Sequence, residues 1–87
     1  MNPLRPHTTG LALGGFFAVF HFLWAVLVAS GWAQPAMDLV FRLHMLEPVL
    51  RIAPFSIALA VGLIVLTFVV GYVLGWIFAT VWNMAQR

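Results

Sequence analysis

The chain has 87 residues, of which 64% are apolar and 7% are charged. A soluble domain of this size carries about a quarter charged residues and has too little interior to hide so much apolar surface, so the composition indicates that lipid solvates most of the chain. The net charge of +2 comes from four arginines against Asp38 and Glu47, which is too sparse for a nucleic-acid-binding face. The absence of cysteine excludes disulfides, thiolate metal sites and cysteine nucleophiles.

Residues 1–9 form a short polar leader, in which prolines favour an extended chain and Thr8 or Thr9 can cap the helix that follows. Residues 10–32 are predicted to form a first transmembrane helix. Their apolar run would extend about 33 Å, which matches a hydrocarbon core of about 30 Å. A cleaved signal peptide is the alternative, but the run is longer than a signal's apolar part and the leader holds only Arg5.

The first span carries a face of small residues interrupted by one histidine. Steps of three and four residues place these side chains on one side of a helix: Gly10, Gly14, Ala18, His21, Ala25 and Ala29. Small residues allow another helix to approach closely, and an imidazole midway along a span needs a polar partner.

Residues 35–47 predict a short amphipathic helix in the connection. Pro35 suits a first helical turn, and Pro48 and Pro54 interrupt the chain before it re-enters the bilayer. The segment is too short to span a bilayer and too apolar for an exposed loop. We expect it to lie in the membrane interface, with a shallow re-entrant helix as the alternative.

The charged residues of the connection are spaced by four. This spacing predicts ion pairs between Asp38 and Arg42 and between Glu47 and Arg51 at the headgroup boundary. Such pairs are ordinary helix-surface contacts and do not indicate an acid–base site.

Residues 55–82 are predicted to form the second span, and residues 83–87 a polar tail. The span would extend about 42 Å, so it must tilt or protrude from the bilayer. It has its own line of small and polar residues: Ser56, Ala60, Thr67, Gly71, Gly75, Ala79 and Asn83. Trp32 and Trp82 fall at span ends, where indole rings prefer to lie.

The fold class predicted for residues 1–87 is an all-α integral membrane unit, an antiparallel two-helix hairpin with an interfacial helix in its connection. Counting outwards from the connection places Gly10 and Gly14 level with Ala79 and Gly75. The same count places His21 beside Thr67, and we predict a hydrogen bond between them. The expected helix-packing residues are Gly10, Gly14, Ala18, His21, Ala25, Thr67, Gly71, Gly75 and Ala79.

His21 has three possible roles: a hydrogen-bonded packing residue, an axial ligand for haem iron or bacteriochlorophyll magnesium, or a proton-relay group. His44 is predicted to be an interfacial polar side chain, and His7 to be solvated. The histidine spacing does not form a metal site. No serine or threonine has a nearby base and orienting acid, so the chain is predicted not to be an enzyme.

The segment from Ala18 to Trp24 around His21, with Trp32 near the helix end, resembles the single-span light-harvesting polypeptides of purple bacteria. In that family a small residue lies four positions before the pigment-binding histidine, whereas here that position is Phe17. The resemblance covers the first third of the chain and implies a pigment-ligand role for His21.

Residues 10–83 resemble small bacterial two-helix membrane proteins of unknown function. The likeness rests on Gly10 to Gly14, His21, Trp24, Gly31 to Pro35, His44, Pro54–Phe55, Gly71–Tyr72, Gly75–Trp76 and Trp82–Asn83. It implies a hairpin with a structured connection, and it implies no activity.

The predicted function is therefore that of a non-enzymatic small membrane protein of the bacterial inner membrane. It would be a homo-oligomer or an accessory subunit of a larger membrane complex, with lipid and other transmembrane helices as partners and without nucleic acid. Arginines are shared equally between termini and connection, and the N-terminal amine favours cytoplasmic termini. The alternatives are a haem- or bacteriochlorophyll-associated subunit using His21 and a holin-like or pore-forming oligomer, although few polar residues could line water.

Overall fold

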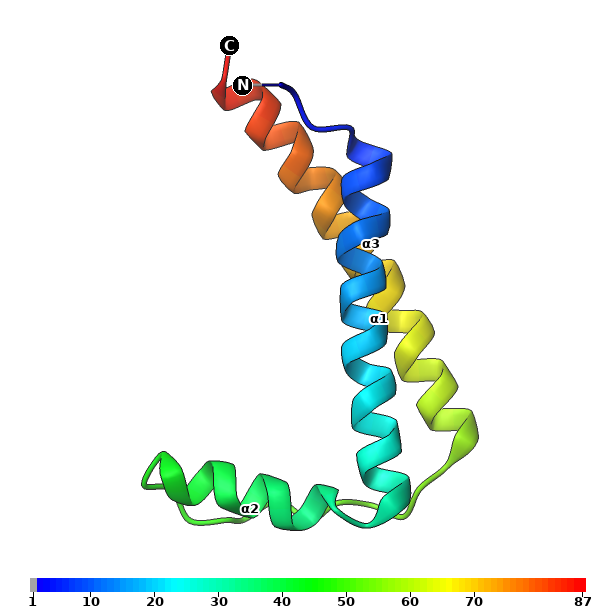
Figure 1. Ribbon diagram of the computed structural model, residues 1–87, viewed down its shortest axis with the longest axis vertical. Helices are drawn as coiled ribbons and strands as arrows, with labels where there is room; N and C mark the ends of the chain where they lie inside the picture. Colours follow the sequence, from blue (N-terminus) through cyan, green and yellow to red (C-terminus); the bar gives the residue numbers. More distant parts are fainter. Residues whose placement is uncertain (1) are drawn as a thin grey trace.

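The computed structural model describes residues 2–87 and contains three helices: α1 (Pro6–Ser30), α2 (Ala33–Leu43) and α3 (Ile57–Ala85). No strand occurs in this part of the chain. α1 and α3 pack against each other, crossing obliquely, while α2 leaves the end of α1 and runs sideways (Figure 1). The start of α1 and the end of α3 lie at the same end of the molecule, far from α2 (Figure 1).

α1 begins at Pro6, four residues before the predicted start at residue 10. Proline suits the first turn because the N–H that it lacks would have no helical partner there. Arg5 precedes the helix without a capping side chain, and the Thr9 N–H already bonds the Arg5 carbonyl. Thr8 and Thr9 therefore lie inside the helix, and the predicted threonine cap is wrong.

Gly31 ends α1 and turns the chain towards α2. Its φ of 86° lies in the left-handed region, which glycine adopts without steric cost. The N–H groups of Gly31 and Trp32 bond the carbonyls of Val28 and Leu27, which closes the last turn. α2 can therefore begin only two residues later, at the buried Ala33.

α2 is amphipathic and ends at Leu43, four residues before the predicted limit. The Leu46 N–H bonds back to the Phe41 carbonyl across a turn in which Met45 has a φ of 61°. This left-handed residue stops the helix before Glu47. Glu47 and Arg51 consequently share no helix face.

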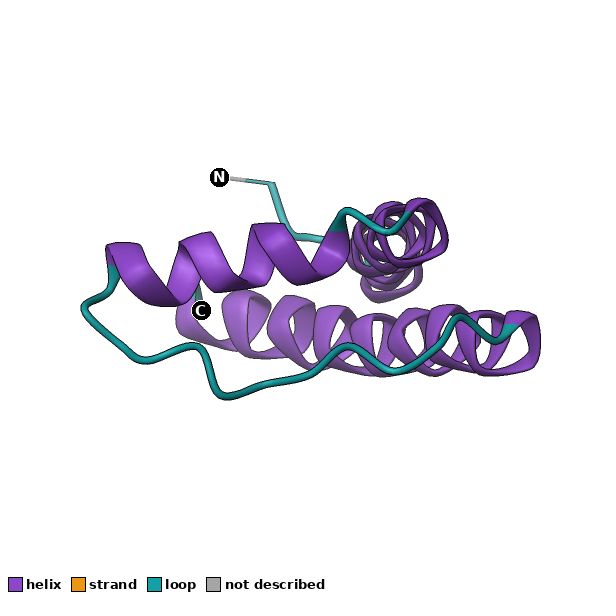
Figure 2. Ribbon diagram, turned by 90° about the horizontal axis from the view of Figure 1, so that it is seen from below, coloured by secondary structure: helices purple, strands orange, loops and turns teal. Residues whose placement is uncertain are grey.

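Residues 44–56 contain a turn but no helix, and the chain runs back alongside α2 before entering α3 (Figure 2). We call residues 46–56 the return segment. Ser56 caps α3 by accepting a bond from the Leu59 N–H at 3.4 Å. α3 then continues to Ala85, three residues beyond the predicted end at 82.

α1 and α3 are both long and apolar enough to cross a membrane. Their lengths of 25 and 29 residues correspond to about 37 and 43 Å of helix. Only 6% of the most apolar stretch of each is buried inside the protein. A core helix of a soluble protein covers its apolar face against neighbouring elements, whereas these two helices are apolar on all sides.

Candidate functional site

Four glycines form the centre of the contact between α1 and α3. Gly10, Gly14, Gly71 and Gly75 are all buried, as is Ala79. A Cβ atom at Gly71 would lie 2.7 Å from the Gly14 Cα, and one at Gly75 would lie 2.8 Å from the Gly10 Cα. The opposing atoms belong to backbone and cannot rotate away, so the close approach of the helices depends on these glycines.

The register of this contact differs from the predicted one by one helical turn. Gly10 lies against Gly75 and Gly14 against Gly71, whereas counting from the connection placed Gly10 level with Ala79. The predicted register is wrong because the two helices cross obliquely, so residues at equal distances from the connection do not lie opposite each other. The helices interlock where both lack side chains, and this requirement sets their alignment.

The contact loosens towards the connection, where α1 and α3 diverge (Figure 1). Ala18, His21, Ala25 and Thr67 are half-buried, and Ala29 is exposed. The structure thus brings together the glycine part of the predicted face and leaves its histidine part more open.

His21 and Thr67 each bond to their own helix. The Nδ1 atom of His21 lies 2.8 Å from the Phe17 carbonyl oxygen, and the Thr67 hydroxyl donates to the Leu63 carbonyl at 2.8 Å. The predicted hydrogen bond between His21 and Thr67 is therefore wrong. A carbonyl one turn earlier satisfies each polar group without help from the other helix.

The backbone bond fixes how the His21 ring can act. A carbonyl oxygen only accepts, so the neutral ring carries its proton on Nδ1 and keeps a lone pair on Nε2. His44 makes the same contact, with Nδ1 2.7 Å from the Val40 carbonyl oxygen. The arrangement leaves both rings able to accept a bond or a metal through Nε2.

A polar pair that the sequence did not reveal lies beside the glycine contact. His7 Nδ1 and the Tyr72 hydroxyl are 2.8 Å apart, and the rings meet edge to face at 5.7 Å between centroids. His7 is exposed as predicted, but it belongs to the first turn of α1, one turn before Gly10 on the same face. The three-residue step from His7 to Gly10 is the sequence pattern that could have revealed it.

Asn83 ties the start of the chain to the end of α3. Its Nδ2 donates to the Leu4 carbonyl at 2.8 Å, and its Oδ1 accepts from the Leu4 N–H at 2.8 Å. The amide side chain thus forms two reciprocal hydrogen bonds with the Leu4 backbone, as a residue of a neighbouring β-strand does. We call this pair the terminal clamp.

Gln34 plays the equivalent part at the connection. Its Oε1 accepts from the Ile52 N–H at 2.7 Å, while its Nε2 donates to the Leu50 carbonyl at 2.9 Å and to Asp38 at 3.0 Å. We call this arrangement the connection clamp. Asp38 is held by Gln34 rather than by Arg42, and neither predicted ion pair forms within residues 2–87.

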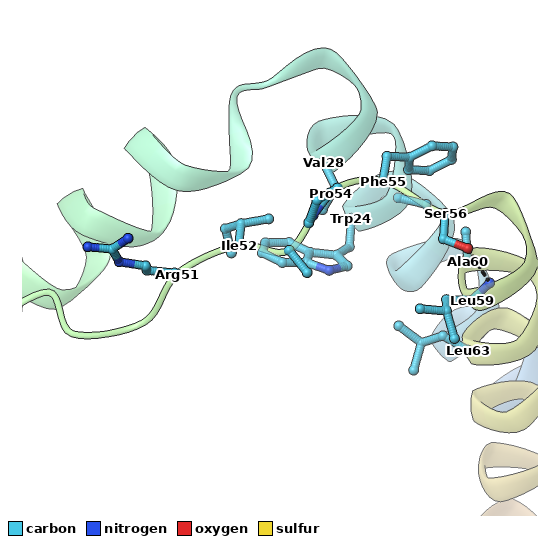
Figure 3. Close-up of a pocket in the computed structure, with 12 residues that line it drawn as sticks. Trp24, Val28, Arg51, Ile52, Pro54, Phe55, Ser56, Leu59, Ala60 and Leu63 are labelled. Carbon is cyan, nitrogen blue, oxygen red and sulfur yellow. Dashed lines mark hydrogen bonds between the residues drawn. The ribbon is translucent and has the colours of Figure 1, made fainter.

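A pocket of about 240 Å³ opens where the two long helices diverge (Figure 3). Trp24 and Val28 of α1 and Leu59 and Leu63 of α3 form its sides, and the return segment closes one end. Arg51 is the one charged residue in its lining. We call this cavity the fork pocket.

Comparisons with protein families, with characterised proteins and with solved structures find no match to this chain. Within residues 2–87 no three histidine or acidic side chains gather closely enough to hold a metal ion. The arrangement of the two apolar helices is therefore the basis on which a function can be argued.

Proposed function

We propose that the chain is a non-enzymatic integral membrane protein that packs laterally against other transmembrane helices, either in copies of itself or in a larger membrane complex. The main support for this proposal is that large apolar side chains project outwards from both long helices. Phe16 and Phe20 of α1 are 64% and 62% exposed, and Leu66 and Phe78 of α3 are 59% and 55% exposed. Exposure of such a surface to water is unfavourable, whereas lipid or another apolar helix would cover it.

In this proposal α1 and α3 form an antiparallel transmembrane hairpin. The terminal clamp and the shared end of α1 and α3 support placing both termini at one membrane surface. α3 exceeds a hydrocarbon core of about 30 Å, and its oblique course across α1 supports a tilted span. The amphipathic α2, running sideways at the other end, suits the headgroup boundary.

Lateral partners would meet faces other than the glycine contact, because that contact is already occupied within the chain. Gly15 and Gly62 remain open, since a Cβ atom at either position would meet nothing within 4 Å. These positions allow another helix to approach from outside.

The test is a mild detergent purification in which mass and absorbance are read together, after carbonate extraction of the membranes. We expect the chain to remain in the membrane pellet and to elute as an oligomer or with foreign subunits. A chain extracted by carbonate would contradict membrane integration. A colourless monomer would contradict lateral packing.

A cofactor-associated subunit is the second candidate, favoured by the free Nε2 lone pair of His21 within an apolar span. His44 provides the matched control, because its ring makes the same backbone bond outside the spans. An absorption band of haem or bacteriochlorophyll that is lost in His21→Ala and kept in His44→Ala would support this candidate. A colourless native preparation would exclude it.

A pore is less well supported, because few polar side chains lie along the two long helices. Thr67 and Thr80 donate their hydroxyl protons to the Leu63 and Trp76 carbonyls of their own helix, which leaves only acceptor lone pairs for water.

A further inference from the structure

We infer that the fork pocket binds one anionic phospholipid, with an acyl chain between α1 and α3 and the phosphate at Arg51. This inference rests on the proposed membrane location. It assigns a ligand class to the cavity that the divergence of α1 and α3 leaves open.

The walls of the pocket suit an acyl chain. Trp24, Val28 and Leu63 are half-buried apolar side chains that face the cavity from both helices. Figure 3 shows Pro54 and Phe55 at the end where the return segment joins α3. An apolar cavity between two helices in a bilayer gains van der Waals contact when it is filled, and water would find few polar partners there.

The size of the pocket favours a chain over a protein helix. A helix with its side chains is about 10 Å across, which a cavity of about 240 Å³ cannot admit. A single extended hydrocarbon chain is narrow enough to enter. An acyl chain can therefore fill the pocket, whereas a helix of a second copy could only cover its opening.

Arg51 supplies the recognition of the headgroup. It lies at the outer end of the pocket, beyond Ile52 and on the side of α2 (Figure 3). Its guanidinium is exposed and forms no ion pair within residues 2–87, because Asp38 is held by Gln34 and Glu47 is not within pairing distance. A guanidinium binds phosphate oxygens in a bidentate fashion, and basic pockets between transmembrane helices are typical sites for anionic headgroups.

The position of Arg51 is fixed by the connection clamp. Gln34 holds the backbone on both sides of Arg51, through the Leu50 carbonyl and the Ile52 N–H. The arginine backbone is thus held level with α2 while the side chain stays free. A phosphate bound there would lie where headgroups lie in the proposed arrangement.

Native mass spectrometry of the full chain tests the inference. The chain is released from nanodiscs that contain equal amounts of phosphatidylglycerol and phosphatidylcholine with matched acyl chains. The variants are Arg51→Gln, the charge-matched control Arg42→Gln on α2 outside the pocket, and Ala60→Phe, which fills the pocket while keeping Arg51. We expect one phosphatidylglycerol retained per wild-type chain. Arg51→Gln should lower its retention about five-fold, and Arg42→Gln should leave it unchanged.

Ala60→Phe should lower the retention of both lipids, with an unchanged helix content showing that the hairpin has folded. Equal retention of the two lipids by the wild type, or equal losses in Arg51→Gln and Arg42→Gln, would overturn the inference. A wild-type dimer without lipid that Ala60→Phe dissociates would overturn it in favour of a second copy. A chain that never enters the nanodisc would instead contradict the proposed membrane location.

Discussion

At the scale of single residues, four glycines decide how closely the two long helices approach. Gly71 faces the Gly14 Cα and the Leu13 carbonyl oxygen, and Gly75 faces Gly10 and the Thr9 carbonyl oxygen. Backbone atoms on the opposite helix leave no rotamer by which an added methyl group could be accommodated. Alanine and glycine therefore differ sharply at these positions, although both count as small residues in a sequence pattern.

Gly71→Ala should destabilise the packed pair by about 1–3 kcal/mol, the usual cost of forcing extra volume into a tight contact. Gly62→Ala, measured on the monomer, is the matched control for the contact within the chain, because it lies on the same helix and a Cβ atom there would meet nothing within 4 Å. It should raise the stability by less than about 1 kcal/mol, because alanine has a higher helix propensity than glycine. Denaturation in mixed micelles measures both. Equal effects of the two variants would contradict the register described here.

The terminal clamp gives a second prediction at this scale. Asn83→Ala removes both hydrogen bonds to Leu4, each worth about 0.5–1.5 kcal/mol. We expect hydrogen exchange at the Leu4 amide to rise about ten-fold. Thr80→Ala is the control, since its hydroxyl bonds only the Trp76 carbonyl of its own helix. Unchanged protection of Leu4 in Asn83→Ala would show that the clamp does not form in solution.

Residue spacing predicted which glycines belong to a helix-packing face, but it could not predict their partners. Gly10 and Gly14 were assigned partners four residues away from those that they contact. Counting from the connection predicts a bond between Thr67 and His21, yet each has an acceptor one turn earlier in its own helix. Spacing within a helix identifies a face. Pairing between helices depends on where their two backbones can approach most closely.

At the scale of elements, the connection shows most clearly what composition does and does not determine. An amphipathic helix was predicted over residues 35–47, and the structure places one over Ala33–Leu43. Its early end depends on Met45, whose left-handed conformation is unusual for a residue other than glycine and has no sequence pattern that announces it. The return segment is held by the amide of Gln34, whose partners are backbone groups, and a sequence pattern does not specify these.

Gln34→Leu should release the return segment without separating α1 from α3. Leucine is one bond shorter than glutamine, and it can neither accept from the Ile52 N–H nor donate to the Leu50 carbonyl. We expect faster hydrogen exchange at the Ile52 amide, with exchange in α1 and α3 unchanged. Gln34→Glu keeps an acceptor for Ile52 and should lie between the two. Global unfolding in Gln34→Leu would mean that the connection supports the whole helix pair.

At the scale of the whole molecule, length and composition predicted two long apolar helices, and the structure confirms two helices of that kind packing against each other. Their angle could not be predicted, because it follows from the glycine crossing and from the divergence that the return segment allows. The fork pocket is a result of that angle. No local pattern in the sequence marks it.

The proposed arrangement of the chain across a bilayer can be tested with single cysteines, because the sequence contains no cysteine. Asn2→Cys and Gln86→Cys lie at the end shared by the start of α1 and the end of α3, and Met45→Cys lies at the connection, where Met45 is 94% exposed. A membrane-impermeant thiol reagent applied to sealed vesicles should label the first two from one side and the third from the other. Labelling of all three from one side would contradict the hairpin.

The glycine crossing lies closer to the end of α3 than to its start, so the two parts of α3 on either side of the crossing differ in length. From the crossing near residue 73, about 24 Å of α3 extends to its start at Ile57, but only about 15 Å to Asn83. If the helices turn as rigid rods about the glycines, Ile57 moves about one and a half times as far as Asn83. Release of the terminal clamp at one end would then alter the width of the fork at the other. The two hydrogen bonds of Leu4 thereby gain an influence over a site that neither of them touches.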